Sequence, residues 1–212
     1  MSIELKISKL GGQVLTKQVL SSLLMKYKRP LDKIHELVKE EKLETVKRGL
    51  YIPGAKSGIA RPEPFLIANH LAGPSYVSFE TALSYWGLIP EKINEISSAT
   101  ISKSKLFRTK SGRFRYIHSK LPYYSYGIQQ VELAKNQWAL VASPEKALCD
   151  KIIQTAGLQL RSSRQAMQVL VQDFRIEKSS LKSLDVKIIE SWYQEAPKKD
   201  SIKILIKTLQ EL

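Results

Sequence analysis

The chain has 212 residues, of which 43% are hydrophobic and 25% charged, so it can build one large domain or two smaller ones. Its formal net charge of +14 indicates a polyanionic partner, with a solubility role as the alternative. A single cysteine, Cys149, excludes an intrachain disulfide, and no run of residues approaches the length of a membrane span, so we expect a protein of the reducing cytoplasm.

Residues 15–54 predict two helices joined by a turn. Thr16 is a good N-cap. The apolar residues that follow are three and four positions apart, as on one face of a helix: Val19, Leu20, Leu23, Leu24 and Tyr27. Pro30 ends this helix and can begin the next one, because proline pushes the preceding residue out of the α region. In the second helix we expect a core-facing set of Leu31, Ile34, Leu37 and Val38, with Asp32, Lys33, His35 and Glu36 outside.

Two β-prone runs, 43–46 and 50–53, flank Lys47, Arg48 and Gly49, a sequence typical of a hairpin. Two helices followed by a hairpin predict a winged helix-turn-helix, in which the second helix reads base edges and the hairpin meets phosphates. We expect base contacts from Lys28, Arg29, Lys33 and His35, and phosphate contacts from Lys17, Lys47 and Arg48. The alternative is a helical subdomain with a solvated basic face. Inward packing of Lys33 and His35, or folding of the hairpin loop against the neighbouring domain, would contradict the DNA hypothesis.

Residues 53–64 contain three prolines and two glycines without an apolar period, so we expect a connection there. This predicts a winged helix-turn-helix domain over residues 1–60 and a second domain over residues 61–212. Residues 1–12 are expected to add a short helix or strand to the first domain. Residues 1–60 also hold 12 Lys+Arg against 6 Asp+Glu, the largest cationic excess per residue in the chain.

The second domain is expected to mix helices and short strands. Residues 64–71 are apolar and fit a strand or a short helix, and Ser78 is expected to cap a helix that ends at Gly87. Strands are expected over residues 96–102, 106–109, 113–118, 123–133 and 138–142, which together predict a mixed or antiparallel sheet. Helices are then expected from Ser143, from about 162, over 180–195, and after a cap at Asp200.

Four carboxylates could in principle converge on a metal for nuclease chemistry: Glu80, Glu91, Glu145 and Asp150. Glu91 and Glu145 each follow a proline near the end of an element, however, which a cap or dipole role explains. The three histidines are far apart in sequence, so no metal site is expected. Cys149 lies beside apolar residues and is expected to be a buried structural thiol. We therefore expect no catalytic residue, metal or cofactor.

A second basic cluster occurs on the expected central hairpin and consists of Arg108, Lys110, Arg113 and Arg115. Along residues 113–116 the side chains alternate between faces, so Arg113 and Arg115 share one side of the strand. The cluster predicts either a half-buried strand with a solvated face or a basic platform for nucleic acid or an acidic partner.

Three segments of the second domain carry a resemblance to a known family: YVSFETALSYWGLIPE, the basic hairpin FRTKSGRFRYIH and ALVASPEKALCDKI. In this order, and after a winged helix ending in KRGLYIPG, they resemble the AbiEi-type antitoxins of type IV abortive-infection toxin–antitoxin systems. The likeness spans roughly residues 12–155. Trp86 departs from it, since a smaller or polar ring such as His is expected before the Gly-Leu pair.

The resemblance implies a transcriptional repressor that binds inverted repeats in its own promoter and is not itself an enzyme. It also implies that the C-terminal domain neutralises a nucleotidyltransferase-like toxin. The predicted fold class is α+β, with an N-terminal winged helix-turn-helix, then a mixed α/β domain with a small sheet and a helical C-terminal part. Open alternatives are a stand-alone DNA-binding regulator without a toxin, a metal-dependent nucleic-acid enzyme, and a protein-binding module built on the winged helix.

Overall fold

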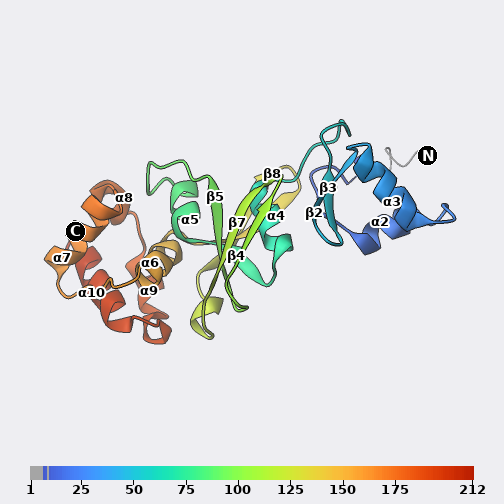
Figure 1. Cartoon of the computed structure of the whole chain (residues 1–212). Helices are drawn as coiled ribbons and strands as arrows, with labels where there is room; N and C mark the ends of the chain where they lie inside the picture. Colours follow the sequence, from blue (N-terminus) through green and yellow to red (C-terminus); the bar gives the residue numbers. More distant parts are fainter. Residues whose placement is uncertain (1–6, 9) are drawn as a thin grey trace.

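In a computed structural model, which describes residues 7, 8 and 10–212, the chain forms three regions in a row. A small N-terminal unit lies at one end, a six-stranded sheet lies in the middle, and a group of helices lies at the C-terminal end (Figure 1). The expected mixed α+β class is confirmed by this arrangement. The short element expected within residues 1–12 lies mostly outside the described residues.

From residue 15 to residue 53 the N-terminal unit contains two helices and three short strands. In chain order these are β1 (Leu15–Thr16), α2 (Lys17–Leu23), α3 (Pro30–Lys39), β2 (Leu43–Lys47) and β3 (Leu50–Pro53). The strands pair antiparallel in the order β1-β3-β2. The local signals behave as expected: the Thr16 side chain accepts a hydrogen bond from Val19 N, Pro30 occupies the first turn of α3, and Gly49 takes a φ of +80° at the hairpin turn.

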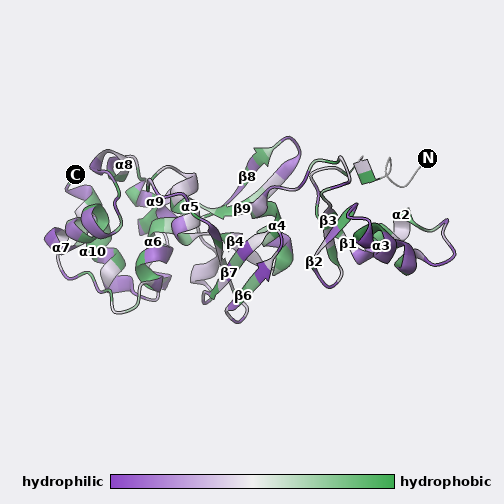
Figure 2. Cartoon of the chain, turned by 45° about the horizontal axis from the view of Figure 1, so that its top comes forward, coloured by the Kyte–Doolittle hydropathy of each residue, from purple (hydrophilic) through white to green (hydrophobic). Residues whose placement is uncertain are grey.

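The buried face of the two helices is narrower than the sequence pattern predicts. Leu20, Leu24, Ile34 and Leu37 are buried, as expected. The prediction that Leu31 faces the core is wrong, because its side chain is 44% exposed. Val19 and Tyr27 of the predicted apolar stripe are also 39% and 42% exposed. The hydrophobic cluster of this unit therefore takes one or two residues from each turn of these helices. Figure 2 shows hydrophilic and hydrophobic residues side by side along α3.

The middle region contains the elements from residue 64 to residue 142. They are α4 (Pro64–Leu71), β4 (Ser75–Val77), α5 (Phe79–Tyr85), β5 (Glu95–Thr100), β6 (Lys105–Thr109), β7 (Gly112–His118), a 3-10 helix η1 (Tyr123–Ser125), β8 (Ile128–Ala134) and β9 (Gln137–Ala142). The sheet order is β6-β7-β5-β4-β9-β8, with parallel pairing of β5 to β7 and of β4 to β9. Residues 64–71 are therefore helical, and residues 123–125 are not part of the strand expected over 123–133.

The C-terminal region is helical, as expected, but more broken. It contains α6 (Pro144–Gln154), α7 (Ser163–Gln168), a π-helical turn η2 (Val169–Asp173), α8 (Lys178–Lys182), α9 (Val186–Glu190), a 3-10 helix η3 (Tyr193–Glu195) and α10 (Lys199–Gln210). The single helix expected over 180–195 is wrong, because the Asp185 side chain accepts from Lys187 N and starts a new helix there. The N-cap of α10 is Lys198, not Asp200.

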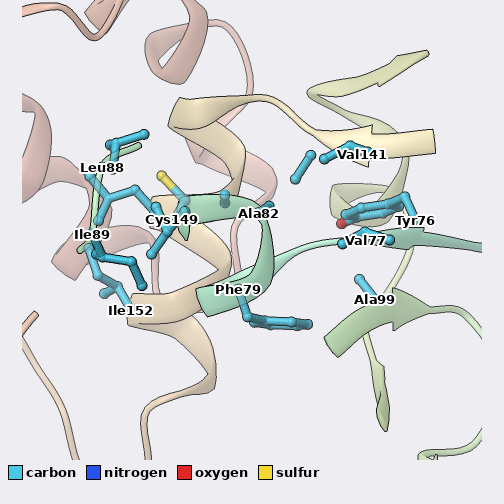
Figure 3. Packing of buried hydrophobic residues seen from close by; sticks show 14 of the residues in the cluster. Tyr76, Val77, Phe79, Ala82, Leu88, Ile89, Ala99, Val141, Cys149 and Ile152 are labelled. Atoms are coloured by element: carbon cyan, nitrogen blue, oxygen red, sulfur yellow. The ribbon is translucent and has the colours of Figure 1, made fainter. Parts of the chain in front are cut away.

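Two hydrophobic clusters fill the molecule. The smaller one lies within the N-terminal unit and includes Leu20, Ile34 and Leu37. The larger one runs from the sheet into the C-terminal helices, and Figure 3 shows part of it, where Cys149 and Ile152 of α6 pack near the α5 residues Phe79 and Ala82. Cys149 is buried, as expected. No helix in the described part of the chain is long and apolar enough to span a membrane.

The β2–β3 hairpin belongs to both regions. Val46, Leu50 and Ile52 are part of the larger cluster, together with Ile67 and Leu71 of α4. One face of the hairpin therefore packs on the sheet region. The hairpin nevertheless precedes residues 53–64, the connection expected between the two domains.

Polar contacts at the tips of two hairpins strengthen this junction. At the β8–β9 turn, Gln13 Nε2 donates to the Asn136 carbonyl over 2.7 Å, and Glu63 N donates to Gln137 Oε1 over 2.6 Å. At the β6–β7 turn, Ser111 donates to Glu44 of β2.

Candidate nucleic-acid interface

The hairpin tip and the start of α2 form one corner of the N-terminal unit. Lys17 N donates to the Gly49 carbonyl over 2.9 Å, because β1 pairs with β3 directly before α2 begins. This bond brings Lys17 next to Arg48, the residue before Gly49. Both side chains are exposed, and within the described residues neither forms an ion pair or a side-chain hydrogen bond. Two expected phosphate-contacting residues are thus adjacent and unengaged.

Lys47 is held differently from its neighbour Arg48. Its Nζ donates to the Leu71 carbonyl at the end of α4 over 2.5 Å. Lys47 also lines a hollow of about 200 Å³ at this junction, with Lys103 and Lys105 among the other lining residues. The hairpin loop is therefore folded against the neighbouring region through Lys47 but not through Arg48, so the contact that counts against the DNA hypothesis is present for one of the two loop cations.

The residues expected to read bases lie at the turn before α3 and on α3 itself. Lys28 and His35 are exposed. Arg29 is 82% exposed and lies 3.7 Å from Asp32, a distance that gives a weak, solvent-screened pair.

Among the residues expected to contact bases, Lys33 makes the strongest contact within the protein. Its side chain is only 20% exposed, and its Nζ lies 2.5 Å from Glu36 Oε1, a hydrogen bond that raises the pKa of Lys33. The expectation that Lys33 and His35 both lie outside therefore holds for His35 and only in part for Lys33.

The second basic cluster is partly neutralised by a neighbouring strand. Because β5 and β7 run parallel with Glu95 opposite Arg113, the carboxylate lies between two arginines. Arg113 Nη2 is 3.1 Å from Glu95 Oε2, and Arg115 Nε is 2.5 Å from Glu95 Oε1. Arg113 and Arg115 do share the exposed side of β7, as expected. The sequence pattern did not reveal Glu95, since it lies 18 residues before Arg113 and meets it only through sheet register.

The other two members of this cluster have different surroundings. Arg108 is exposed and lies opposite Arg113 in the β6–β7 ladder. Lys110 lies at the hairpin turn and lines a hollow of about 280 Å³ that also contains Glu41 and Glu44. Acidic side chains therefore accompany Arg113, Arg115 and Lys110, which leaves Arg108 as the cluster member with the most unscreened charge.

Of the four carboxylates considered for catalysis, Glu80 and Glu91 line one hollow of about 570 Å³, whereas Glu145 and Asp150 are not in its lining. Glu80 pairs with Lys151. Glu145 accepts from Ser143 Oγ over 2.8 Å and from Asp185 N over 3.1 Å, so it ties the start of α6 to the loop before α9. Among the described residues there is no group of three His, Cys, Asp or Glu side chains that could hold a metal ion.

Asp150 instead lies in a buried polar network with Lys146, one turn earlier on α6. The two side chains are 3% and 0% exposed, and Lys146 Nζ is 2.9 Å from Asp150 Oδ1. Asp150 also accepts hydroxyl hydrogen bonds from Tyr76, Ser78 and Tyr123 over 3.1, 2.7 and 2.8 Å. Burial lowers the pKa of Lys146, and the nearby Asp150 carboxylate opposes that shift.

The hydroxyls and the ammonium in this network all have partners, so it suits a structural role. Lys146 Nζ donates a second hydrogen bond to the Tyr123 carbonyl over 3.1 Å and lies 3.1 Å from the centroid of the Tyr123 ring. Burial, reinforced by Asp150, raises the pKa of Tyr123 and of Tyr76 well above the ordinary tyrosine range. Lys146 was not singled out from the sequence. The available signal was a lysine and an aspartate four residues apart on a helix with an apolar stripe.

Comparison with known proteins gives a likeness of fold. The crystal structure of the RV2827C protein from Mycobacterium tuberculosis matches with a TM-score of 0.64 and 12% sequence identity, over 98% of this chain and 75% of that one. At this identity the likeness concerns the fold alone. No protein-family model matches the chain, and no curated protein does.

Proposed function

We propose that this chain is a DNA-binding transcriptional repressor whose N-terminal unit is a winged helix-turn-helix. The observation that carries the proposal is the corner where Lys17, at the start of α2, lies beside Arg48, at the tip of the β2–β3 hairpin, and where neither side chain has an ionic or hydrogen-bonding partner among residues 7, 8 and 10–212. The strand order β1-β3-β2 and the order of helices before the hairpin support it, as does the net charge of +14.

In the proposed complex, α3 enters the major groove of double-stranded DNA and the hairpin tip follows the backbone. Lys17 and Arg48 bind phosphates, and Lys28, Arg29 and His35 lie at the groove. Lys33 and Lys47 take a smaller part, because Glu36 and the Leu71 carbonyl already engage them.

The test is equilibrium binding to labelled duplexes that tile the region upstream of the gene, with a scrambled duplex of equal length beside each. The variant carrying Lys17→Ala and Arg48→Ala should bind every duplex more weakly, and the slope of log K against log[salt] should become shallower by about 2. A matched variant carrying Lys199→Ala and Lys203→Ala, which removes two exposed cations from α10, should keep the parent slope. Equal slopes for the parent and the Lys17/Arg48 variant would contradict the assignment.

A second variant separates the two sides of the hairpin. Lys47→Ala should lower the melting temperature, because the ammonium bridges to α4, and should leave the salt slope nearly unchanged. If Lys47→Ala makes the slope of log K against log[salt] shallower by as much as Arg48→Ala does, Lys47 also contacts phosphate.

We propose further that residues 61–212 act as the antitoxin of a type IV toxin–antitoxin system against a nucleotidyltransferase-like toxin. This part of the proposal is supported by the motifs quoted from the second domain. If a reading frame of that class adjoins the gene, its induction should arrest growth and co-expression of this chain should restore it. Rescue should persist in the Lys17/Arg48 variant, which separates neutralisation from repression. Absence of rescue would leave a stand-alone DNA-binding regulator.

A further inference from the structure

Leu31 is an exposed apolar side chain at the start of α3. It occupies the first turn of the helix and is 44% exposed, whereas Ile34 and Leu37 behind it are 1% exposed and fill the core. The preceding turn adds Tyr27, 42% exposed, and Met25, 79% exposed. The sequence pattern assigned Leu31 to the core, but the fold leaves it at the surface.

Of the polar neighbours of Leu31 on the first turn, Lys33 is engaged within the helix, and Asp32 forms only a weak, solvent-screened pair with Arg29. Asp32 lies 3.7 Å from Arg29, and Lys33 lies 2.5 Å from Glu36. Leu31 therefore offers an uncovered apolar contact at the place where N-terminal residues of a reading helix reach base edges.

The charge around this side chain restricts what can cover it. Lys26, Lys28 and Arg29 are exposed in the turn before α3, so a covering surface that is anionic as well as apolar is favoured. The major groove of DNA combines both features, since phosphates border it and each thymine presents a C5-methyl group.

We propose that Leu31 reads thymine methyl groups and that the preferred half-site places a thymine opposite the first turn of α3. This inference rests on the proposed function, because it requires α3 to lie in the major groove. It makes Leu31 a specificity-determining residue and A·T pairs the preferred base pairs at that position.

The test replaces thymine by uracil in the best-binding upstream duplex, one position at a time. The exchange removes only the methyl group and keeps the charge and the hydrogen-bonding edge of the base. At one or two positions the parent protein should lose affinity roughly threefold to fivefold, the effect of uncovering one methyl group. The Leu31→Ala protein should bind thymine and uracil duplexes equally, while its salt slope stays that of the parent.

Met25→Ala is the matched control, because Met25 is the more exposed apolar residue but lies in the turn outside α3. It should keep the sensitivity to uracil. Leu31→Ala should keep the parent melting temperature, since it removes no core contact.

Three results would overturn the inference. If the parent binds upstream DNA but ignores the methyl group at every position, the inference fails and the proposed function stands. Methyl sensitivity that survives in Leu31→Ala assigns the reading to another residue. The inference and the proposed function both fail if the protein binds no duplex and instead co-sediments with anionic vesicles, and if Leu31→Ala abolishes that co-sedimentation.

Discussion

Lys146→Met tests whether the buried network on α6 holds the second domain together. Methionine replaces the ammonium with an apolar group of similar length and leaves Asp150 enclosed, 3% exposed. The carboxylate keeps hydroxyl donors from Tyr76, Ser78 and Tyr123 but loses the cation 2.9 Å away, and the Tyr123 carbonyl loses a donor. Removing one partner of a buried ion pair costs about 3–5 kcal/mol, because an uncompensated charge remains inside.

That loss converts to a large thermal shift. For a domain of 150–250 residues, 1 kcal/mol moves the melting temperature by roughly 2–4 °C, so Lys146→Met should lower it by roughly 6–20 °C. Adding Asp150→Asn should recover part of this loss, because the carboxamide still accepts hydroxyl hydrogen bonds and carries no charge. The two substitutions should therefore be strongly non-additive in a double-mutant cycle.

Urea and thermal unfolding followed by circular dichroism measure these differences. Lys203→Met is the control, since Lys203 is exposed on α10 and its replacement should change the free energy of unfolding by less than about 0.5 kcal/mol. A loss below about 1 kcal/mol for Lys146→Met, or strict additivity with Asp150→Asn, would refute the reasoning that the pair is a buried, coupled unit.

Three smaller predictions concern other positions. Gly127→Ala should destabilise the protein far more than Gly157→Ala, although both glycines have positive φ. An added Cβ at Gly127 would lie 2.6 Å from the Lys146 Cβ, whereas an added Cβ at Gly157 would meet open space. Thermal melts should therefore show only the backbone penalty of roughly 1–2 kcal/mol for Gly157→Ala. Glu44→Ala should lower the free energy of unfolding by about 1–2 kcal/mol in urea titrations, because it releases β2 from the β6–β7 turn. His70 is exposed overall, but partial desolvation lowers its pKa, so the unfolded chain binds its proton first as pH falls through about 6.5 and stability falls slightly with it. His70→Gln should therefore show a slightly smaller drop in melting temperature between pH 7.5 and 5.5.

The elements of the N-terminal unit were predictable because their signals are local. A hydroxyl at residue 16, a proline at residue 30 and a glycine at residue 49 fix a cap, a helix start and a turn through their own backbone chemistry. The choice of buried face was less predictable. Periodicity gave Leu31 and Ile34 equal weight, but the tertiary packing covers Ile34 and leaves Leu31 44% exposed.

The candidate interface was likewise predictable only in part. Local composition located the cations, but it did not show which ones already have partners. Glu95 reaches Arg113 and Arg115 through the parallel register of β5 and β7. Lys47 reaches the Leu71 carbonyl only because the hairpin packs on α4. Both contacts join segments at least 18 residues apart, so a pattern read along the chain does not contain them.

This sorting of the cations has a measurable consequence for the size of the DNA interface. Three cations, Lys17, Lys47 and Arg48, were expected to bind phosphates, and three phosphate contacts would give a slope of log K against log[salt] of about −2.7. Of these three, Lys47 is engaged by the Leu71 carbonyl, which leaves Lys17 and Arg48. Two contacts predict a slope of about −1.8, measured by titrating binding to upstream DNA across monovalent salt. A slope of about −3.6 or beyond would mean that further cations also bind phosphates, and Lys103→Ala with Lys105→Ala tests whether Lys103 and Lys105, beside Lys47, are among them.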